Sequence, residues 1–185
     1  MVTRIVWQRL DVPGLEWAQI DRRADGSTLV GTAIVVQDQV IHRIEYSIEL
    51  DASGRTRTAH VDAAAGDDAP LRIDLVADGH GRWECDGATV IDSPGCLDID
   101  IGFSPLTNSL PIWRLGLEPG ESRDIETAWL RFPGLDLIQG SQTYDRVGDR
   151  TWRYRSARFE ALLEVDAEGL VTEYGRYWRA VGRGA

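Results

Sequence analysis

Apolar and polar residues alternate at every second position along much of the chain. The clearest runs lie at 43–50, 71–75 and 97–101, and residues 123–132 follow the same pattern more loosely. A period of two is typical of β-strands that bury one face and expose the other. The sequence therefore predicts a chain built almost wholly of β-strands.

Turn signals separate these runs at intervals of roughly ten residues. Asp-Gly pairs stand at 25–26, 78–79 and 86–87, and longer turn sequences stand at 51–54, 118–121 and 166–169. Turns this short join antiparallel neighbours, because parallel strands need a long crossover. We count roughly a dozen or more strands by these rules. The exception is 103–111, where two prolines interrupt any strand and predict a short helical or irregular piece.

A sheet of that many strands must curl, since flat open sheets rarely exceed about ten strands. The chain has 185 residues, which suits one domain. We therefore predict a single all-β domain over residues 1–185, in which a large antiparallel curved sheet is rolled into an incomplete barrel, or β-roll, with a central cavity. A closed barrel and a sandwich are the alternatives. Curved sheets of this size often hold a ligand in the hollow.

The chain carries a net charge of −10, and all 20 of its basic residues are arginines. This acidic balance disfavours nucleic acid as a partner, because such binding depends on basic side chains that neutralise phosphates. It also disfavours docking on anionic membranes. The absence of lysine excludes chemistry that needs a lysine nucleophile, a Schiff base or a P-loop lysine.

Neither a signal peptide nor an apolar run long enough to span a membrane is evident in the sequence. We therefore expect a cytoplasmic protein without membrane insertion. In that compartment Cys85 and Cys96 are predicted to stay reduced, with a disulfide across a hairpin as the alternative. The sequence predicts no cofactor and no metal site, because the three histidines are far apart and the nucleotide-binding motifs are missing.

Polar groups are densest in residues 94–115, where Asp98 and Asp100 lie two positions apart on a predicted strand. Both carboxyl groups should point to the same face of that strand. On an outer face they would be solvated, whereas on an inner face they would need a partner or a ligand. We expect Arg114, placed by the pattern in the following strand, to be the partner. Two acids at this spacing could instead serve as acid and base in a hydrolase.

Several other side chains are candidates for contact with a ligand. Thr107 and Asn108 lie between two prolines and offer groups that suit sugar or head-group hydroxyls, or that satisfy the loop's own backbone. Seven Trp and five Tyr are spread along the chain, and most should belong to the core. Those that we select as candidate ligand contacts are Tyr46, Trp83 and Trp113. No residue is predicted to be catalytic, since neither Gly-x-Ser-x-Gly nor a histidine-based triad is present.

The residues at 95–100 and 104–115 resemble the signature of the bacterial "putative glycolipid-binding" family, which reads approximately Gly-Cys-Asp-x-Asp followed by Thr-Pro-x-Thr-Asn-Thr-Leu-Pro-Ile-Arg-Arg-Leu. Further segments agree, including those at 133–135, 142–144 and 165–171. Trp113 departs from the pattern, because it stands where the family has the first of two arginines. The resemblance implies a curved, many-stranded β-roll and a glycolipid or similar amphiphile as ligand.

Three functional hypotheses follow. In the first, the protein binds a small amphiphile without catalysis: aromatic and aliphatic side chains take the acyl part, and the polar groups are taken by Asp98, Asp100, Asn108 and Arg114. In the second, Asp98 and Asp100 catalyse hydrolysis or isomerisation of a small hydrophobic or sugar substrate. In the third, the domain is a structural or interaction module whose interior is packed shut. The sequence does not indicate an oligomeric state.

Overall fold

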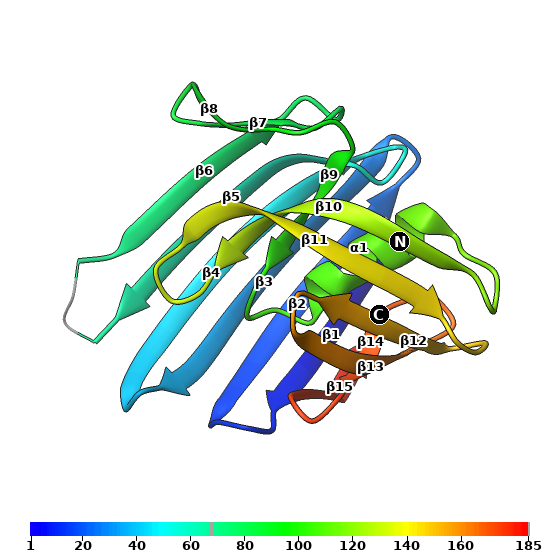
Figure 1. Cartoon of the computed structure of the whole chain (residues 1–185). Helices are drawn as coiled ribbons and strands as arrows, with labels where there is room; N and C mark the ends of the chain where they lie inside the picture. The colour runs from blue at the N-terminus through cyan, green and yellow to red at the C-terminus, as the bar shows by residue number, and fades with distance from the viewer. Residues whose placement is uncertain (67–68, 185) are drawn as a thin grey trace.

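The computed structural model describes residues 1–66 and 69–184, and a single β-sheet dominates it (Figure 1). The strands are β1 (Val2–Arg9), β2 (Gly14–Arg23), β3 (Gly26–Gln37), β4 (Val40–Asp51), β5 (Thr56–Ala65), β6 (Leu71–Ala77), β7 (Arg82–Cys85), β8 (Ala88–Asp92), β9 (Cys96–Ile101), β10 (Ser122–Arg131), β11 (Asp136–Arg146), β12 (Thr151–Ser156), β13 (Phe159–Val165), β14 (Val171–Tyr174) and β15 (Trp178–Gly184). Between β9 and β10 lie the 3₁₀ helix η1 (Leu106–Asn108) and the α-helix α1 (Ser109–Leu115).

Over residues 1–66 and 69–184 the sheet has 15 strands, and its order follows the chain in two runs. From one edge the order is β8 back to β1, and from there it continues with β15 back to β9. The first and last strands of the chain therefore pair with each other in the middle of the sheet. The prediction of an all-β fold with mainly antiparallel pairing is confirmed.

One pair departs from the antiparallel rule, because β9 and β10 are parallel. The turn signals could not indicate this pair, since they describe only short connections. The chain between β9 and β10 runs through η1 and α1, which gives it the length that a parallel crossover requires.

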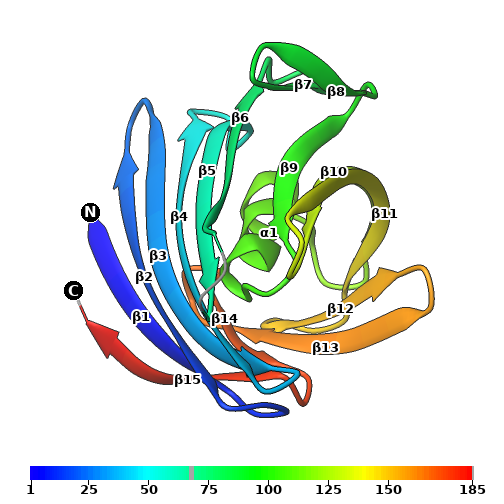
Figure 2. The same ribbon diagram turned by 90° about the vertical axis from the view of Figure 1, so that its left-hand side faces the viewer.

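The sheet curls strongly but does not close into a barrel. Figure 2 shows that β1–β6 form one wall and that β10 and β11 lie opposite it, with α1 and β9 between them, while β12 and β13 run along the lower side. The two edge strands, β8 and β9, are not paired with each other. The inner side of β9 instead meets β5, where the backbone N–H of Ile99 donates to Oγ1 of Thr56 at 3.2 Å. An edge covered in this way is protected from pairing with another chain.

The helical segment occupies the centre of the roll, which corrects the expected position of the cavity, because the space that remains lies beside the helices. Leu106 of η1 and Leu110 of α1 belong to the main core cluster. The predicted irregular piece at 103–111 is confirmed, but the helix continues to Leu115, so Arg114 lies in α1 and not in a strand. Pro111 is tolerated because it falls in the first turn, where its missing N–H breaks no helical hydrogen bond.

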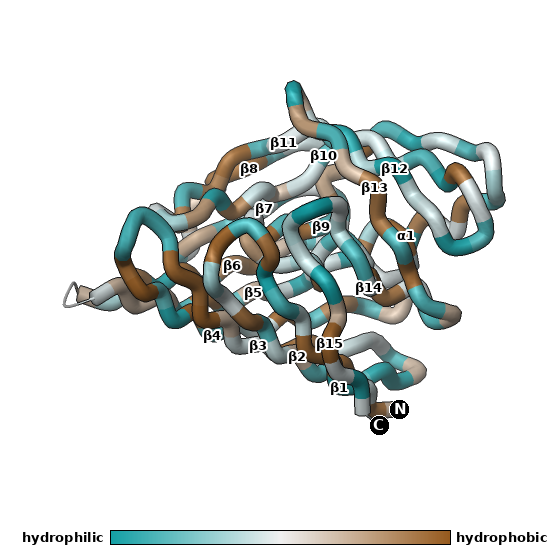
Figure 3. The backbone as a smooth tube through the Cα atoms, turned by 90° about the horizontal axis from the view of Figure 1, so that it is seen from below, coloured by the Kyte–Doolittle hydropathy of each residue, from teal (hydrophilic) through white to brown (hydrophobic). Residues whose placement is uncertain are grey.

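Hydrophobic and hydrophilic residues alternate along the strands, as the colours in Figure 3 show. Burial follows this alternation, so it corresponds to the two faces of the sheet. In β4, Ile44, Tyr46 and Ile48 are buried while Arg43 and Glu45 are exposed. Strand β9 behaves differently, because residues on both of its faces are buried or half-buried. This strand lies inside the roll, so Asp98 and Asp100 face the protein interior, which is the second of the two cases that the sequence left open.

Cys85 and Cys96 are free thiols, in agreement with the predicted reduced state. Burial raises the pKa of the Cys96 thiol to about 12. Among the residues described, no helix combines the length and apolar character needed to cross a membrane.

Candidate functional site

A cavity of about 430 Å³ lies beside the helical segment, and we call it the aromatic cavity. Its walls come from the end of β9 and the following loop, from β10, and from β12 to β15. The lining residues are Asp100, Ile101, Gly102, Phe103, Ser104, Asn108, Trp129, Tyr154, Ser156, Ala157, Arg158, Phe159, Tyr174 and Trp178. Small-molecule sites typically have about 300–1,000 Å³, so this volume suits a ligand or part of one.

Aromatic rings form one continuous wall of the cavity. The centroid of Tyr154 lies 6.0 Å from those of both Phe159 and Tyr174, and Phe159 and Tyr174 are 6.1 Å apart. All three pairs are edge-to-face, the arrangement that the ring quadrupole favours. The cluster extends behind this wall to Tyr144, at 5.3 Å from Tyr154, and to Tyr177, at 5.5 Å from Phe159. Packing of this kind holds the wall rigid.

Asp100 is the only carboxylate among the described residues that line this cavity. Nε2 of Gln142 donates to its Oδ2 at 2.5 Å, and Thr107 provides a second side-chain hydrogen bond. Burial raises the pKa of Asp100 from 3.8 to about 6, and these two hydrogen bonds oppose the shift. No ion pair in residues 1–66 and 69–184 involves Asp100. At neutral pH the group is therefore a half-buried carboxylate without a cation.

Several other polar groups at the cavity also lack a partner. Oδ1 of Asn108 accepts a hydrogen bond from the hydroxyl of Tyr144 at 3.0 Å, whereas the amide NH₂ of Asn108 donates to no described residue. Within the described part of the chain the same holds for the indole N–H groups of Trp129 and Trp178 and for the hydroxyl of Tyr174. None of these four groups is a fully buried atom without a partner, so each is open to the cavity and available to a ligand or to water.

Asp98 is placed differently from Asp100, although both point to the side of β9 on which the helical segment packs. The carboxylate of Asp98 is fully buried and receives Nε of Arg114 at 3.0 and 3.1 Å and Nη2 at 2.5 Å. The expected ion pair is thus present. Burial raises the pKa of Asp98, and the guanidinium of Arg114 opposes this effect. Asp98 and Arg114 satisfy each other and do not line the aromatic cavity.

Thr107 and Trp83 have structural contacts of their own. Oγ1 of Thr107 accepts the backbone N–H of Ile101 at 3.2 Å and so holds the end of β9 against η1. Trp83 is fully buried in the core, and its indole N–H donates to the carbonyl of Cys96 at 2.8 Å. Neither residue lines the aromatic cavity.

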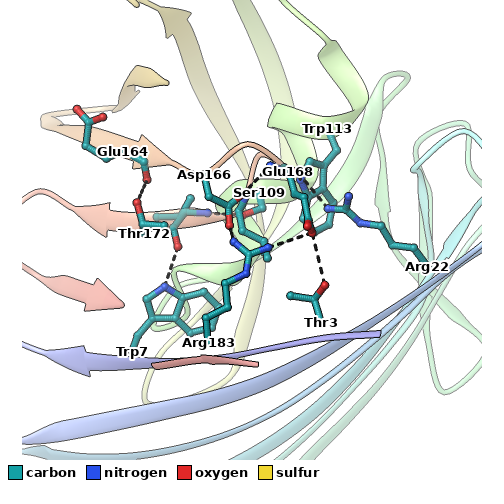
Figure 4. Close-up of polar contacts among 12 residues, drawn as sticks. Thr3, Trp7, Arg22, Ser109, Trp113, Glu164, Asp166, Glu168, Thr172 and Arg183 are labelled. Atoms are coloured by element: carbon teal, nitrogen blue, oxygen red, sulfur yellow. Dashed lines mark hydrogen bonds and ion pairs between the residues drawn. The ribbon is translucent and has the colours of Figure 1, made fainter. Parts of the chain in front are cut away.

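Trp113 belongs to a separate cluster that closes one end of the roll (Figure 4). Its indole N–H donates to the carbonyl of Glu168 at 2.9 Å, and the guanidinium of Arg22 stacks 4.1 Å from its ring centroid. Arg183 forms ion pairs with Asp166 and with Glu168. These contacts hold the turn between β13 and β14 against β1, β2, β15 and α1. The contacts of Trp113 therefore give it a structural role.

Tyr46 takes part in a buried network that the sequence did not reveal. Its hydroxyl donates to Oε1 of Glu16 at 2.5 Å, and Oγ of Ser104 donates to the same oxygen at 2.6 Å. Glu16 is fully buried, and its Oε2 has no partner among the described residues. Burial raises the pKa of Glu16 from 4.5 to about 7, against the effect of both hydrogen bonds. Ser104 lines the aromatic cavity, so this network holds one of the lining residues in place.

The network depends on a glycine opposite Tyr46. A Cβ at Gly31 would lie 2.2 Å from Cζ of Tyr46, so only glycine lets the ring cross β3 toward Glu16. We expect Gly31→Ala to lower the free energy of unfolding by about 1–3 kcal/mol through overpacking, measured by urea denaturation. Gly182→Ala is the matched control, because its Cβ would meet Val6 at an ordinary 3.8 Å. Equal unfolding midpoints for the two variants would contradict this reading.

Of the eight candidate residues, Asp100 and Asn108 line the cavity, Thr107 and Tyr46 contact residues that line it, and the other four have contacts elsewhere. Sequence reasoning missed Trp129, Tyr154, Tyr174 and Trp178 as a group. A signal existed for Tyr154, since residues 152–155 alternate aromatic and cationic side chains. A signal also existed for Glu16, which shares the phase of the buried Ala18 and Ile20 along β2. In the described residues no group of three or more His, Cys, Asp and Glu is placed to hold a metal ion.

The fold and the cavity together define a class of open all-β proteins, in which one curved sheet surrounds an aromatic hollow. The chain belongs to the family described as "Putative glycolipid-binding", which matches residues 4–180. This confirms the resemblance seen in residues 95–115.

Two solved structures are similar to this chain. A DUF1089 family protein from Pseudomonas aeruginosa shares 30% sequence identity and superimposes with a TM-score of 0.77 over 86% of this chain and 88% of its own. A beta-barrel-like protein of the domain of unknown function DUF1849 from Brucella abortus has 11% identity and a TM-score of 0.59 over 98% and 96% of the two chains. The second likeness concerns the fold alone. No curated protein matches the chain.

Proposed function

We propose that the protein binds an amphiphile with a polyhydroxylated head group, such as a glycolipid, in the aromatic cavity and does not transform it. The observation that carries this proposal is the set of polar groups without partners in an otherwise aromatic cavity. The carboxylate of Asp100 can accept hydrogen bonds from hydroxyl groups, and the amide of Asn108 can donate them. Aromatic faces suit both the apolar face of a sugar ring and an alkyl chain.

The two rival hypotheses have less support. Hydrolysis or isomerisation by Asp98 and Asp100 needs both acids at the substrate, but both carboxylate oxygens of Asp98 are bound by Arg114. A packed interaction module needs a filled interior, whereas the aromatic cavity has about 430 Å³ and polar groups that no described residue satisfies. The family description agrees with a lipid-like ligand.

Titration calorimetry with octyl β-glucoside tests the proposal. We expect saturable binding, weakened about tenfold or more in Trp129→Ala because a ring of the cavity is lost, which corresponds to about 1.4 kcal/mol. Trp17→Ala is the matched control, since Trp17 is 39% exposed and lies outside the cavity. Native mass spectrometry of gently purified protein should show a bound amphiphile. No heat of binding for any alkyl glycoside, together with a consistently empty protein, would overturn the proposal.

A further inference from the structure

The strongest remaining feature of the aromatic cavity is its uncompensated negative charge. The groups that face Asp100 are neutral: Gln142 on β11 and Thr107 on η1 bind its carboxylate, and the phenols of Tyr144, Tyr154 and Tyr174 lie nearby. The other acid on β9, Asp98, already has its own arginine. A half-buried carboxylate without a cation is costly, and a hydroxyl ligand would relieve that cost only in part.

The rings around this carboxylate are suited to a cation. Trp129, Tyr154, Phe159, Tyr174 and Trp178 line the same cavity as Asp100. The negative faces of such rings attract ammonium groups, and sites for quaternary ammonium ligands are built from several rings in this way. One of these rings already holds a cation of the protein, since the guanidinium of Arg9 lies 5.0 Å from the centroid of Trp178.

Neither of the nearby arginines takes the place of such a ligand. Arg9 forms an ion pair with Asp11 at 2.6 Å and does not line the cavity. Arg158 does line it, but its side chain is exposed at the turn between β12 and β13, where solvent and salt screen its charge. The cavity therefore combines an unpaired carboxylate with aromatic walls and no competing internal cation among the described residues.

We propose that the head group selected by the aromatic cavity carries a positively charged nitrogen, which is held by Asp100 and by the surrounding rings. This inference rests on the proposed function and narrows its ligand class to amphiphiles with an ammonium group. An amino sugar and a choline-type head group share this chemistry. They differ in the hydrogen bonds that they can donate, so separate probes distinguish them.

Titration calorimetry at pH 7.0 with four octyl probes tests the inference. The probes are octyl β-glucosaminide, its N-acetyl derivative, octyl β-glucoside and octyltrimethylammonium. We expect octyl β-glucosaminide, octyltrimethylammonium or both to bind at least about tenfold tighter than the two neutral glycosides. Whichever of the two cationic probes binds more tightly shows whether the head group is an amino sugar or of the choline type. Since the pKa of Asp100 is about 6, the preference should shrink as the pH falls to 5.0.

Asp100→Asn should abolish the preference for a cation, so that the two cationic probes bind no more tightly than the two neutral glycosides. Asp124→Asn is the matched control, because Asp124 is exposed on β10 and lies outside the cavity. If Asp100→Asn does not fold, the pH dependence of the unaltered protein still decides the question. If neither cationic probe binds more tightly than the two neutral glycosides, this inference alone is overturned. Failure of all four probes to bind would overturn the proposed function as well.

Discussion

Replacing Arg114 by methionine is expected to lower the free energy of unfolding by about 3–5 kcal/mol near pH 7.5. The substitution keeps the aliphatic stem of the side chain but removes every donor that reaches the carboxylate of Asp98. Asp98 is fully buried, so its charge would be left without a partner. Urea denaturation of the variant and the unaltered protein measures the loss. The loss should be smaller near pH 5, because an unpaired Asp98 can then take up a proton more easily.

Two control variants separate the ion pair from a general effect of losing an arginine. Arg153→Met removes one member of an exposed pair with Glu160, at 3.6 Å, and should change the free energy of unfolding by at most about 1 kcal/mol. The double variant Asp98→Asn with Arg114→Met should recover much of the stability, since no charge is then buried. Equal losses of unfolding free energy for Arg114→Met and Arg153→Met would show that the buried pair stabilises the fold no more than an exposed pair does.

The strands and their number could be predicted from the sequence because alternation and turn residues are local signals. They describe β4 well, where buried and exposed side chains follow the predicted phase. They fail for β9, because an identical alternation is produced by a strand with one solvated face and by a strand whose polar residues meet partners inside the protein. Only the position of β9 between the two walls decides between these cases, and that position depends on the curl of the whole sheet.

The candidate site was harder to predict than the fold. Asp100 and Asn108 were found because polar residues in an apolar segment stand out locally. The aromatic wall was not found, because its rings come from β12, the start of β13 and β14, and each ring taken alone looks like an ordinary core residue. Trp113 and Trp83 were chosen by residue type, which does not show that their indole groups bind backbone carbonyls.

Among the described residues, three acids that face the interior of the roll have different partners. Asp98 has an arginine, Asp100 has two neutral donors and an open side toward the cavity, and Glu16 has two hydroxyl donors and one oxygen without a partner. Burial raises the pKa of all three acids, and only Asp98 has a counter-charge that opposes this effect. The dependence of the free energy of unfolding on pH can therefore reveal the titration of Asp100 and Glu16.

The protein is expected to be more stable near pH 4.5 than near pH 7.5, opposite to a protein whose carboxylates are stabilised by ion pairs. Burial raises the pKa of Glu16 from 4.5 to about 7, so the folded state holds this proton more tightly than the unfolded state does. The resulting stabilisation is fully present below pH 4.5 and is lost as the pH rises through 7. A shift of this size corresponds to about 3 kcal/mol.

Urea unfolding of the unaltered protein and of Glu16→Gln at several pH values between 4.5 and 7.5 measures this contribution. The variant has no proton to release at this position, so its stability should fall less over the same range. Asp100 adds a decline of the same sign between 3.8 and about 6, which Glu16→Gln retains and Asp100→Asn removes. Glu45→Gln is the matched control, because Glu45 is an exposed residue paired with Arg43 on the outer face of β4. Parallel stability curves for the unaltered protein and Glu16→Gln would show that the buried carboxyl does not titrate in this range.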